Sequence, residues 1–313
     1  MTGELVAHVR EAFGWDEDVV VSPGPRGALG QIWRLEVGTR RFALKEIFAE
    51  PPSAAAIEAE LAFVRRAARA GVRLPASHPD RSGRILLTTP SGRWLRLYDW
   101  VDLRPVDLTS PATPGRLGRL LASLHRCAPA ATGPSEPWYD HVPATREWPA
   151  PDAPWATRLA ECLATLPELC AGVTPADPAG MLVCHRDLHP ENVLADPGRE
   201  LVVVDWDDLG PVEPGRELAR ALFDWFCDGP ADLDAMREMY AEYVRAGGPG
   251  RITGPADFTM LLATRLNFLL AQTRVALDPL AEPRHRAWAE REIDEALRIL
   301  PTPPQLAAAL ALT

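Results

Sequence analysis

Several features that mark other protein classes are scarce or absent in this sequence. The chain has five cysteines and no C-x-x-C pair, which excludes a disulfide framework and suits buried thiols in a reducing compartment. No apolar run is as long as a bilayer span requires, and the first residues include acidic Glu4 without the apolar core of a signal peptide. We therefore expect a cytoplasmic protein.

Basic residues are also fewer than acidic residues. The chain carries 33 Lys and Arg against 43 Asp and Glu, a formal net charge of −10. This balance argues against nucleic acid or an anionic membrane as partner and weakly favours a cationic one, although solubility alone also explains an acidic surface. With 313 residues, 47% of them hydrophobic, the chain is long enough for two modest lobes or one large domain.

The most informative stretches are residues 184–194 (CHRDLHPENVL) and 201–208 (LVVVDWDD). The apolar runs 181–184 and 201–204 read as short buried strands. As one hairpin-like unit, they would bring Asp187, Asn192 and Asp205 together at its mouth. Hard oxygen ligands of this kind suit Mg²⁺, which takes few ligands from protein when nucleotide phosphates and water supply the rest.

The pattern His-Arg-Asp-Leu-X-Pro-X-Asn, followed by an Asp that closes an apolar strand, resembles the catalytic and metal-binding segments of the protein-kinase-like fold. His189 stands where protein kinases usually carry Lys, which makes the chain similar to the aminoglycoside phosphotransferase and choline kinase family. The resemblance implies that Asp187 is the base or orienter for an acceptor hydroxyl and that His185 supports the loop. It also implies that Asn192 and Asp205 hold Mg²⁺.

By the same resemblance we expect an α+β, bilobal fold. Residues 1–101 would form a small nucleotide-binding lobe with a five-stranded antiparallel sheet and a helix, and residues 102–313 a larger, mostly helical catalytic and acceptor-binding lobe. The strands expected from apolar alternation and turn signals are 19–21, 31–37, 41–47, 84–88 and 93–101.

Lys45 lies in the third expected strand. Alternation places Phe42 and Leu44 on one face and Lys45 on the other, and an inward-pointing ammonium needs a partner. Lys45 resembles the kinase-fold lysine that reaches the nucleotide phosphates; the alternative is a strand-edge lysine whose stem covers apolar surface. Helix phase selects Glu60 as its ion-pair partner, with Glu58 as the fallback.

Two further segments are candidates for nucleotide contact. The turn 22–30, which contains Gly27, lacks the G-x-G-x-x-G spacing, so its position alone supports a cover over the phosphates, and an ordinary hairpin turn is the alternative. Asp99, Trp100 and Val101 stand at the expected hinge, where an extended edge offers N–H and C=O groups to adenine. The alternative is a plain interlobe linker.

Acceptor binding is assigned to the second lobe. The Pro-rich passage 129–154 carries several aromatics, which favours an ordered flap over part of the substrate cleft. Acidic residues facing that cleft would bind ammonium groups, although each is otherwise a helix cap or a solvated charge. The candidates are Asp207, Asp208 and Asp224, with Asp228 and Glu213.

The sequence thus predicts transfer of the γ-phosphoryl of ATP or GTP, with Mg²⁺, to a hydroxyl of an aminoglycoside-like cationic antibiotic, by a monomer or homodimer. Protein kinases carry a long activation segment after the metal-binding Asp, and its absence here disfavours a protein substrate. Arg186 and Glu191 stand where the family often has Gly. Kinases of basic peptides, macrolides, choline, sugars or homoserine, and a catalytically silent binding protein, stay open.

Overall fold

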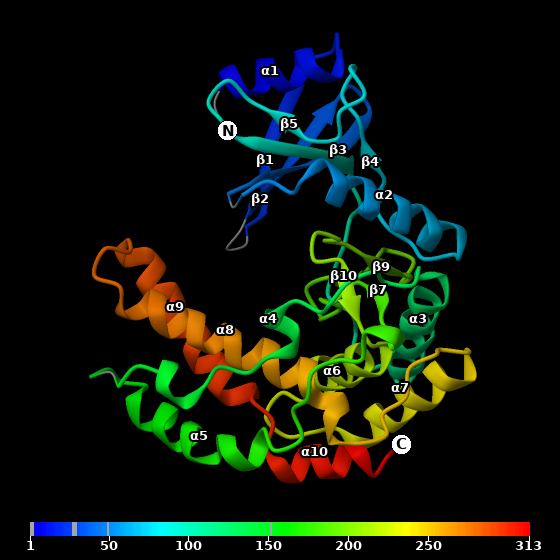
Figure 1. Cartoon of the computed structure of the whole chain (residues 1–313). Coiled ribbons are helices and arrows are strands. Elements are labelled where there is room, and N and C mark those ends of the chain that lie inside the picture. The colour runs from blue at the N-terminus through cyan, green and yellow to red at the C-terminus, as the bar shows by residue number, and fades with distance from the viewer. Residues whose placement is uncertain (1–2, 27–29, 49, 151) are drawn as a thin grey trace. The chain divides into compact units, whose positions relative to one another are not determined.

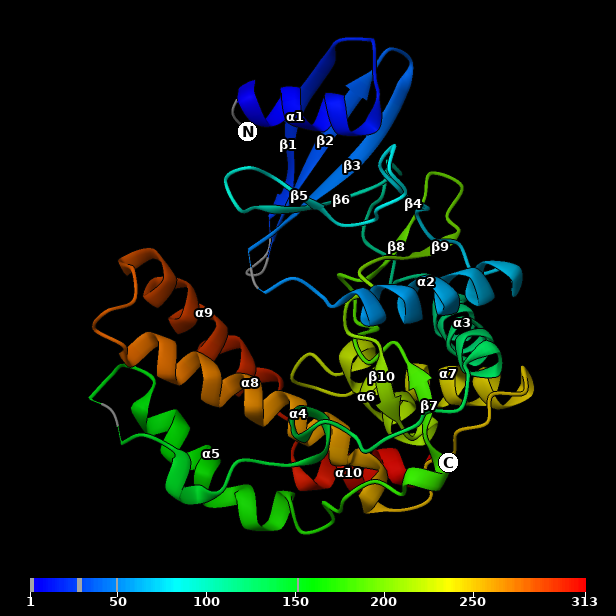
Figure 2. The same ribbon diagram turned by 45° about the horizontal axis from the view of Figure 1, so that its top comes forward.

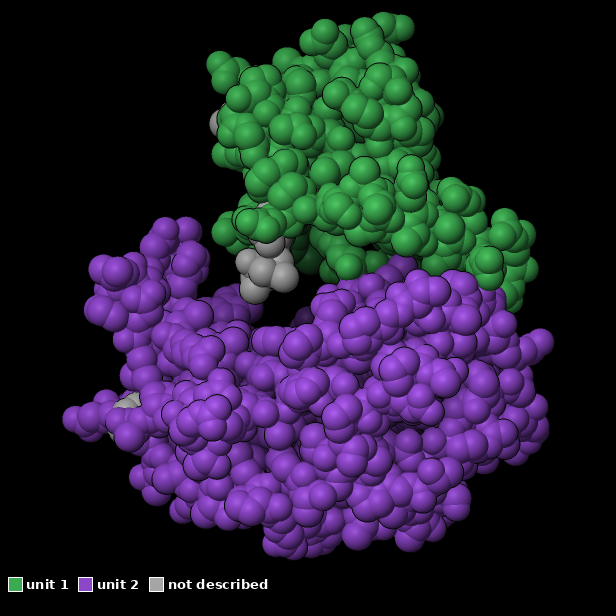
Figure 3. Space-filling view, in the orientation of Figure 1, with its two compact units in different colours: residues 1–105, 193–207 green, residues 106–192, 208–313 purple. Residues whose placement is uncertain are grey.

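The computed structural model describes residues 3–26, 30–48, 50–150 and 152–313 (Figure 1). The chain forms two compact units, one of residues 1–105 with 193–207 and the other of residues 106–192 with 208–313, coloured separately in Figure 3. The sequence predicted two consecutive lobes with a boundary after residue 101. It did not predict that segment 193–207 returns to the first unit.

The first unit is built on an antiparallel sheet with the order β1-β2-β3-β6-β4, and β5 also pairs with β6. The predicted antiparallel sheet is confirmed, but it has a further short strand, β4, and β5 is shorter than the predicted 84–88. The strands are β1 Val19–Arg26, β2 Gly30–Val37, β3 Arg40–Ile47, β4 Ser77–His78, β5 Leu87–Thr88 and β6 Trp94–Asp99.

Two helices belong to the first unit. Helix α1 (Gly3–Phe13) buries Leu5 and Val9 in a core with Leu44 and its neighbours. The predicted alternation of β3 is confirmed, but the core lies on the face of Leu44, opposite to that of Lys45. Helix α2 (Ala54–Arg69) begins at Ser53, whose hydroxyl accepts the Ala56 N–H, as expected of an N-cap. Figure 2 shows α1 and α2 with the sheet.

The second unit is mostly helical. Helices α3 and α7 pack side by side, as do α8 and α9 (Figures 1 and 2). Within the described residues, no helix combines the length and apolarity that crossing a lipid bilayer demands. The α-helices are α3 Thr113–Cys127, α4 Pro137–Asp140, α5 Ala156–Leu169, α6 Pro214–Phe226, α7 Leu233–Arg245, α8 Thr259–Leu277, α9 Pro283–Ile299 and α10 Pro303–Leu310.

The short strands near the catalytic motif pair differently from the prediction. Strand β7 (Leu182–Cys184) pairs with β10 (Gly210–Val212), and β8 (Val193–Ala195) pairs with β9 (Leu201–Val203). The predicted hairpin of 181–184 with 201–204 is therefore wrong. Strand β9 pairs instead with β8, the strand just before it. The turn between them is short, and closing a short loop costs little conformational entropy.

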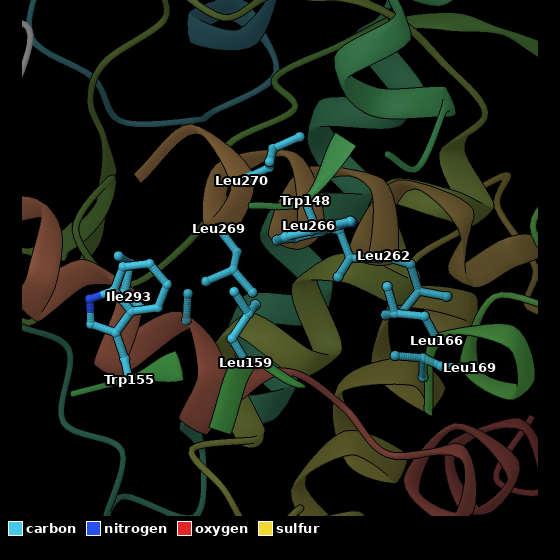
Figure 4. Close-up of a cluster of buried hydrophobic side chains, with 11 residues drawn as sticks. Trp148, Trp155, Leu159, Leu166, Leu169, Leu262, Leu266, Leu269, Leu270 and Ile293 are labelled. Carbon is cyan, nitrogen blue, oxygen red and sulfur yellow. The ribbon is translucent and has the colours of Figure 1, made fainter. Parts of the chain in front are cut away.

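A large apolar core holds α5, α8 and α9 together (Figure 4). Trp155 and Leu159 at the start of α5 are 2% and 1% exposed, and they pack with Leu266 of α8 and Ile293 of α9. The side chain of Trp148 also joins this core. The end of the Pro-rich passage is thus anchored in the core rather than free in solvent.

Gly118 marks a close approach between α3 and α7. A Cβ at this position would overlap the Met239 carbonyl oxygen and lie 2.9 Å from the Tyr243 backbone nitrogen, whereas at Gly115 it would meet the side-chain Cγ of Glu242 at 2.9 Å. Backbone cannot move aside as a glutamate side chain can.

We predict that Gly118→Ala destabilises the second unit by about 1–3 kcal/mol through overpacking. Gly115→Ala serves as the matched control, since both changes gain the same helix propensity of about 1 kcal/mol. Thermal unfolding followed by circular dichroism measures the difference. Equal midpoints for the two variants would contradict the close packing of α3 on α7.

Candidate active site

Lys45 meets two carboxylates in the first unit. Its side chain is 15% exposed, and Nζ lies 2.6 Å from Asp205 Oδ1 and 2.8 Å from Asp207 Oδ2. Burial alone would lower the pKa of Lys45, but the charges of Asp205 and Asp207 outweigh it and raise that pKa. Lys45 is also the only lysine in the sequence. It is therefore a positive charge held directly beside the predicted metal-binding Asp205.

The predicted Lys45–Glu60 ion pair is not formed. The helix phase is confirmed, because Glu60 is buried and Glu58 is exposed, but Glu60 accepts two hydrogen bonds of 2.7 Å from the guanidinium of Arg96. Arg96 lies directly opposite Lys45 in the β3–β6 register and is 0% exposed. A planar guanidinium fits a carboxylate in this two-point manner better than an ammonium does.

Arg96 links its partner Glu60 to the carboxylates around Lys45. Its Nη1 lies 3.2 Å from Asp207 Oδ1, so Glu60, Arg96, Asp207, Lys45 and Asp205 form one continuous network. Two cations against three carboxylates leave the network with one negative charge. A site of that charge favours a bound cation.

The backbone conformation of Asp205 sets the direction of its side chain. It follows β9 in a left-handed conformation with φ of 57°, which few residues other than Gly, Asn and Asp adopt. The next residue, Trp206, is buried, its indole N–H donates to the Val203 carbonyl at 3.3 Å, and its ring meets Phe63 edge-on. Trp206 thus anchors the turn while the Asp205 side chain stays 45% exposed.

The three hinge candidates differ in whether their backbone groups are available to bind adenine. The Asp99 N–H donates to the Ala76 carbonyl and the Trp100 N–H to the Arg41 carbonyl. Both amides are therefore used within the protein and are poor candidates for adenine. Among described residues, none donates to or accepts from the backbone of Val101, which leaves it the best of the three. Gly27 lies outside the described residues.

Asp187 is the focus of the second unit. Its Oδ1 lies 2.7 Å from Arg220 Nη2. Its Oδ2 lies 2.7 Å from Asn192 Nδ2 and 3.2 Å from His189 Nε2. Burial would raise the pKa of Asp187, but His189 and Arg220 outweigh it and hold that pKa well below its usual range. The carboxylate is therefore ionised and fixed, which suits orienting a hydroxyl better than strong base catalysis.

The hydrogen bonds of Asn192 are compatible with a role as metal ligand. Its Nδ2 donates to both the backbone carbonyl and Oδ2 of Asp187. The amide is thereby oriented so that Oδ1, a hard oxygen, is the atom left for a cation. Asp205 supplies a carboxylate of the same character. Asn192 belongs to the second unit and Asp205 to the first, so their joint use of one Mg²⁺ stays a prediction.

His185 and Arg186 hold the loop that carries Asp187. His185 is 1% exposed, so it lies in the interior of the loop and not on a substrate surface. Arg186 has a φ of 67°, its guanidinium lies 4.0 Å from the ring centre of Tyr139, and its Nη1 lies 2.8 Å from Glu136. A Cβ at Gly210 would overlap this guanidinium, so a larger residue there would displace it.

Two of the acids proposed to bind an ammonium group have internal partners. Asp207 pairs with Lys45 and Arg96. Asp224 lies between Arg220 at 3.0 Å and Arg265 at 2.9 Å. Asp208 remains exposed. Burial raises the pKa of the Tyr139 phenol, and the Asp208 carboxylate that accepts its hydrogen bond raises it further.

The remaining two candidates also have partners. Asp228 pairs with Arg298, and Glu213 pairs with Arg216. Asp208 is therefore the member of the predicted set that is not paired with an arginine or lysine among described residues.

A second cluster of metal-binding residue types lies under the catalytic loop. Ligand atoms of His125, Cys184 and Glu217 come within 4.8 Å of one another. His125 uses both ring nitrogens, one on Tyr243 at 2.7 Å and one on Glu217 at 2.5 Å. Burial raises the pKa of Cys184, which keeps it a thiol. These bonds fit a structural role better than a metal site.

Sequence reasoning missed three arginines of this site, Arg96, Arg220 and Arg265. A signal existed for two of them. Arg96 is a charge between Leu95 and Leu97 in an apolar strand, and Arg220 stands four residues before Asp224 on one face of α6, the spacing of a helical ion pair. Nothing in the pattern of α8 distinguishes Arg265 from a surface residue.

Comparisons with known proteins identify the family of this chain. A model of the phosphotransferase enzyme family (APH) matches residues 20–252. An uncharacterised protein of Deinococcus radiodurans is 28% identical over 229 residues, 69% of this chain and 64% of that protein. The match thus spans less than two thirds of this relative's length.

Solved structures show the same fold. A microcompartment-associated aminopropanol kinase has a TM-score of 0.66 at 20% identity, covering 93% of this chain and 95% of that one. A spectinomycin phosphotransferase in complex with ADP and spectinomycin has a TM-score of 0.65 at 14% identity, covering 100% and 98%.

The aspartate of the HRD motif with its Asn and Arg partners, the lysine beside Asp205, and the family match over most of the chain lead to one conclusion. The chain belongs to the phosphotransferase enzyme family and has the protein-kinase-like fold.

Proposed function

We propose that this protein transfers the γ-phosphoryl group of ATP or GTP to a hydroxyl of a small molecule, with Mg²⁺. The observation that carries the proposal is the setting of Asp187, an ionised carboxylate fixed by Arg220, Asn192 and His189. Such transfers need little covalent chemistry from protein, and positioning with charge neutralisation supplies most of the rate.

Each side chain has a distinct task in this proposal. Asp187 accepts a hydrogen bond from the acceptor hydroxyl and aligns its oxygen for in-line attack. Lys45, released from Asp205 and Asp207, neutralises charge on the nucleotide phosphates. Asn192 and Asp205 would hold Mg²⁺, which when bound screens the phosphate oxygens from one another. Val101 would bind the base through its backbone.

A groove in the second unit offers a seat for the acceptor. It has a volume of about 350 Å³ and lies between α8 and the 137–147 segment, within the size range of small-molecule sites. Its lining includes Trp138, which is 41% exposed, and Leu270. Asn267 fixes one wall by donating to the Trp138 and His141 carbonyls at 3.0 and 2.8 Å.

Glu136, the residue before α4, and Tyr139 of α4 contact Arg186 of the catalytic loop. The Pro-rich passage was predicted to be an ordered flap over part of the substrate cleft, and in this proposal its 137–147 segment lines the acceptor groove.

The partners of the candidate acids refine the acceptor class; none of these acids lines the groove, whose charged lining residues are Glu147 and Arg274. The acids expected to attract a polycation are largely neutralised by arginines, while Asp208 is still exposed. We infer an acceptor with a hydroxyl, an apolar portion that stacks on Trp138, and a single amine near Asp208. A panel of amino alcohols, aminocyclitols, aminoglycosides, macrolides and basic peptides tests this class.

Asp187→Asn should lower kcat by about 10²- to 10⁴-fold and leave nucleotide affinity nearly unchanged, because the amide no longer orients or accepts the hydroxyl proton. Asp234→Asn is the control, as that side chain is 93% exposed on α7. Steady-state kinetics with the best acceptor of the panel provides the measurement. Near-normal turnover of Asp187→Asn would refute the assigned role.

The single lysine permits a direct test of the nucleotide site. An ATP acyl-phosphate reagent, which acylates an amine beside the bound phosphates, should modify Lys45 once and be blocked by excess ATP. Peptide mass spectrometry locates the adduct. Because the sequence has no second lysine, the α-amino group is the only competing amine, and modification there alone would contradict phosphate binding by Lys45.

Trp138→Ala should raise the acceptor KM by roughly 5- to 30-fold, the loss of one aromatic contact, and leave the nucleotide KM unchanged. Trp288→Ala is the matched control, because Trp288 on α9 is 43% exposed and does not line the groove. If both variants bind the acceptor as the wild type does, the acceptor does not use this groove.

A further inference from the structure

Helix α6 lies against the catalytic loop and contacts three consecutive residues of it. Glu217 accepts the backbone N–H of Arg186, Arg220 binds the carboxylate of Asp187, and Trp225 donates to the Leu188 carbonyl at 2.8 Å. The first and third of these contacts involve the loop backbone. The contact of Arg220 is the one that reaches the side chain that faces the acceptor.

Arg220 makes more than one bond to the loop. Its Nη2 lies 2.7 Å from Asp187 Oδ1, and its Nη1 donates to the carbonyl oxygen of Arg186. The side chain is 14% exposed. Two adjacent nitrogens of one planar group thus bind the loop backbone and the carboxylate together, which fixes the carboxylate relative to the backbone that carries it.

The guanidinium is itself held on its other side. Its Nε lies 3.0 Å from Asp224 Oδ2, and Asp224 Oδ1 lies 2.9 Å from Arg265 Nη2. Arg265 in turn donates to the Ile299 carbonyl at the end of α9. The two arginines and two aspartates alternate in charge and are mutually neutralised, so removal of one would leave a poorly solvated charge.

The two oxygens of Asp187 are held from different sides. Asn192 and His189 approach Oδ2, both from the loop itself, and Arg220 approaches Oδ1 from α6. Contacts within the loop move with the loop, whereas Arg220 ties the carboxylate to a helix whose inner face is buried. Rotation of the carboxylate about its Cβ–Cγ bond is thereby blocked.

We propose that Arg220 is a positioning residue for phosphoryl transfer, which sets the orientation of the Asp187 carboxylate, and that Asp224 and Arg265 lock Arg220 in place. The inference rests on the proposed function. In the transfer the acceptor oxygen forms a bond to the γ-phosphorus as the bond from that phosphorus to the bridging oxygen breaks, leaving the nucleoside diphosphate. The hydroxyl stays hydrogen-bonded to Asp187 during the transfer and its proton is released to solvent, while Arg220 holds Asp187 in line for that hydroxyl.

The decisive variant is Arg220→Ala, assayed with ATP, Mg²⁺ and the panel acceptor that the wild type turns over fastest. We expect kcat per folded molecule to fall about 10- to 100-fold, as misplacement of a catalytic group does, with the Kd for ATP unchanged by calorimetry. Added guanidinium at tens of millimolar should restore part of the lost kcat, because it can occupy the vacated site between Asp187 and Asp224.

Arg216→Ala is the matched control. Arg216 is a buried arginine of the same helix that pairs with Asp140 and Glu213 and bonds the carbonyls of Thr174 and Pro175. Its loss should lower the melting temperature, and guanidinium should not raise its kcat per folded molecule. This comparison separates a positioning role from a purely structural one.

Two further variants keep the test informative. If Arg220→Ala does not fold, Arg220→Lys retains the charge, and its single ammonium should still lower kcat because it cannot span both carboxylates and the Arg186 carbonyl. Asp224→Asn should lower kcat less than Arg220→Ala does. The double variant should be no worse than Arg220→Ala alone, as expected when Asp224 acts through Arg220.

Normal kcat per folded molecule in Arg220→Ala or Arg220→Lys would overturn the inference, and so would a kcat loss that guanidinium leaves unchanged in a folded Arg220→Ala. A wild-type protein that transfers phosphate to none of the panel would instead refute the proposed function. The two failures are therefore distinguishable.

Discussion

The attachment of the catalytic loop to helix α6 is the constraint on which the rest of the site depends. A loop with a left-handed arginine at position 186 does not hold its shape by local preference, because that backbone conformation costs free energy for a residue with a Cβ. Bonds from Glu217, Arg220 and Trp225 to successive loop residues offset that cost. A carboxylate can be presented in one orientation only because the loop beneath it is fixed.

In both units, arginines hold the buried carboxylates of the site in place. Arg96 takes the carboxylate of Glu60, and Arg220 takes that of Asp187. The chain's only lysine is kept where a mobile point charge is useful, beside Asp205. Guanidinium groups form fixed, planar, two-point contacts, whereas an ammonium can exchange carboxylate partners for phosphate oxygens. The chemistry of the two cations thus explains why arginines fix carboxylates and the lysine stands beside Asp205.

The sequence predicted the parts of this account that depend on local pattern. Alternation located β3 and the orientation of Lys45, helix phase selected Glu60 over Glu58, and the HRD motif located Asp187 and Asn192. Each of these follows from the period of a strand or helix, or from a motif with fixed spacing.

Partner choice was the part that failed. The sequence paired Lys45 with Glu60 and strand 181–184 with 201–204, and both were wrong because a competing partner, Arg96 in one case and β8 in the other, was better placed. Of the acids chosen for an acceptor amine, all but Asp208 have partners within the protein that the sequence did not reveal. Asp224 is acidic and near the loop, but only the fold brings Arg265 from α8 to neutralise it. Long-range pairing of charges has no period in the sequence.

The central claim is that Asn192 and Asp205 hold the metal of a bound nucleotide whose γ-phosphate lies in line with Asp187. A crystal structure of the protein with a non-hydrolysable ATP analogue and Mg²⁺ tests it most directly. The account predicts Asn192 Oδ1 and an Asp205 carboxylate oxygen both at about 2.1 Å from the metal, with Lys45 on the phosphates. A nucleotide-bound structure in which either residue points away from the metal would contradict it.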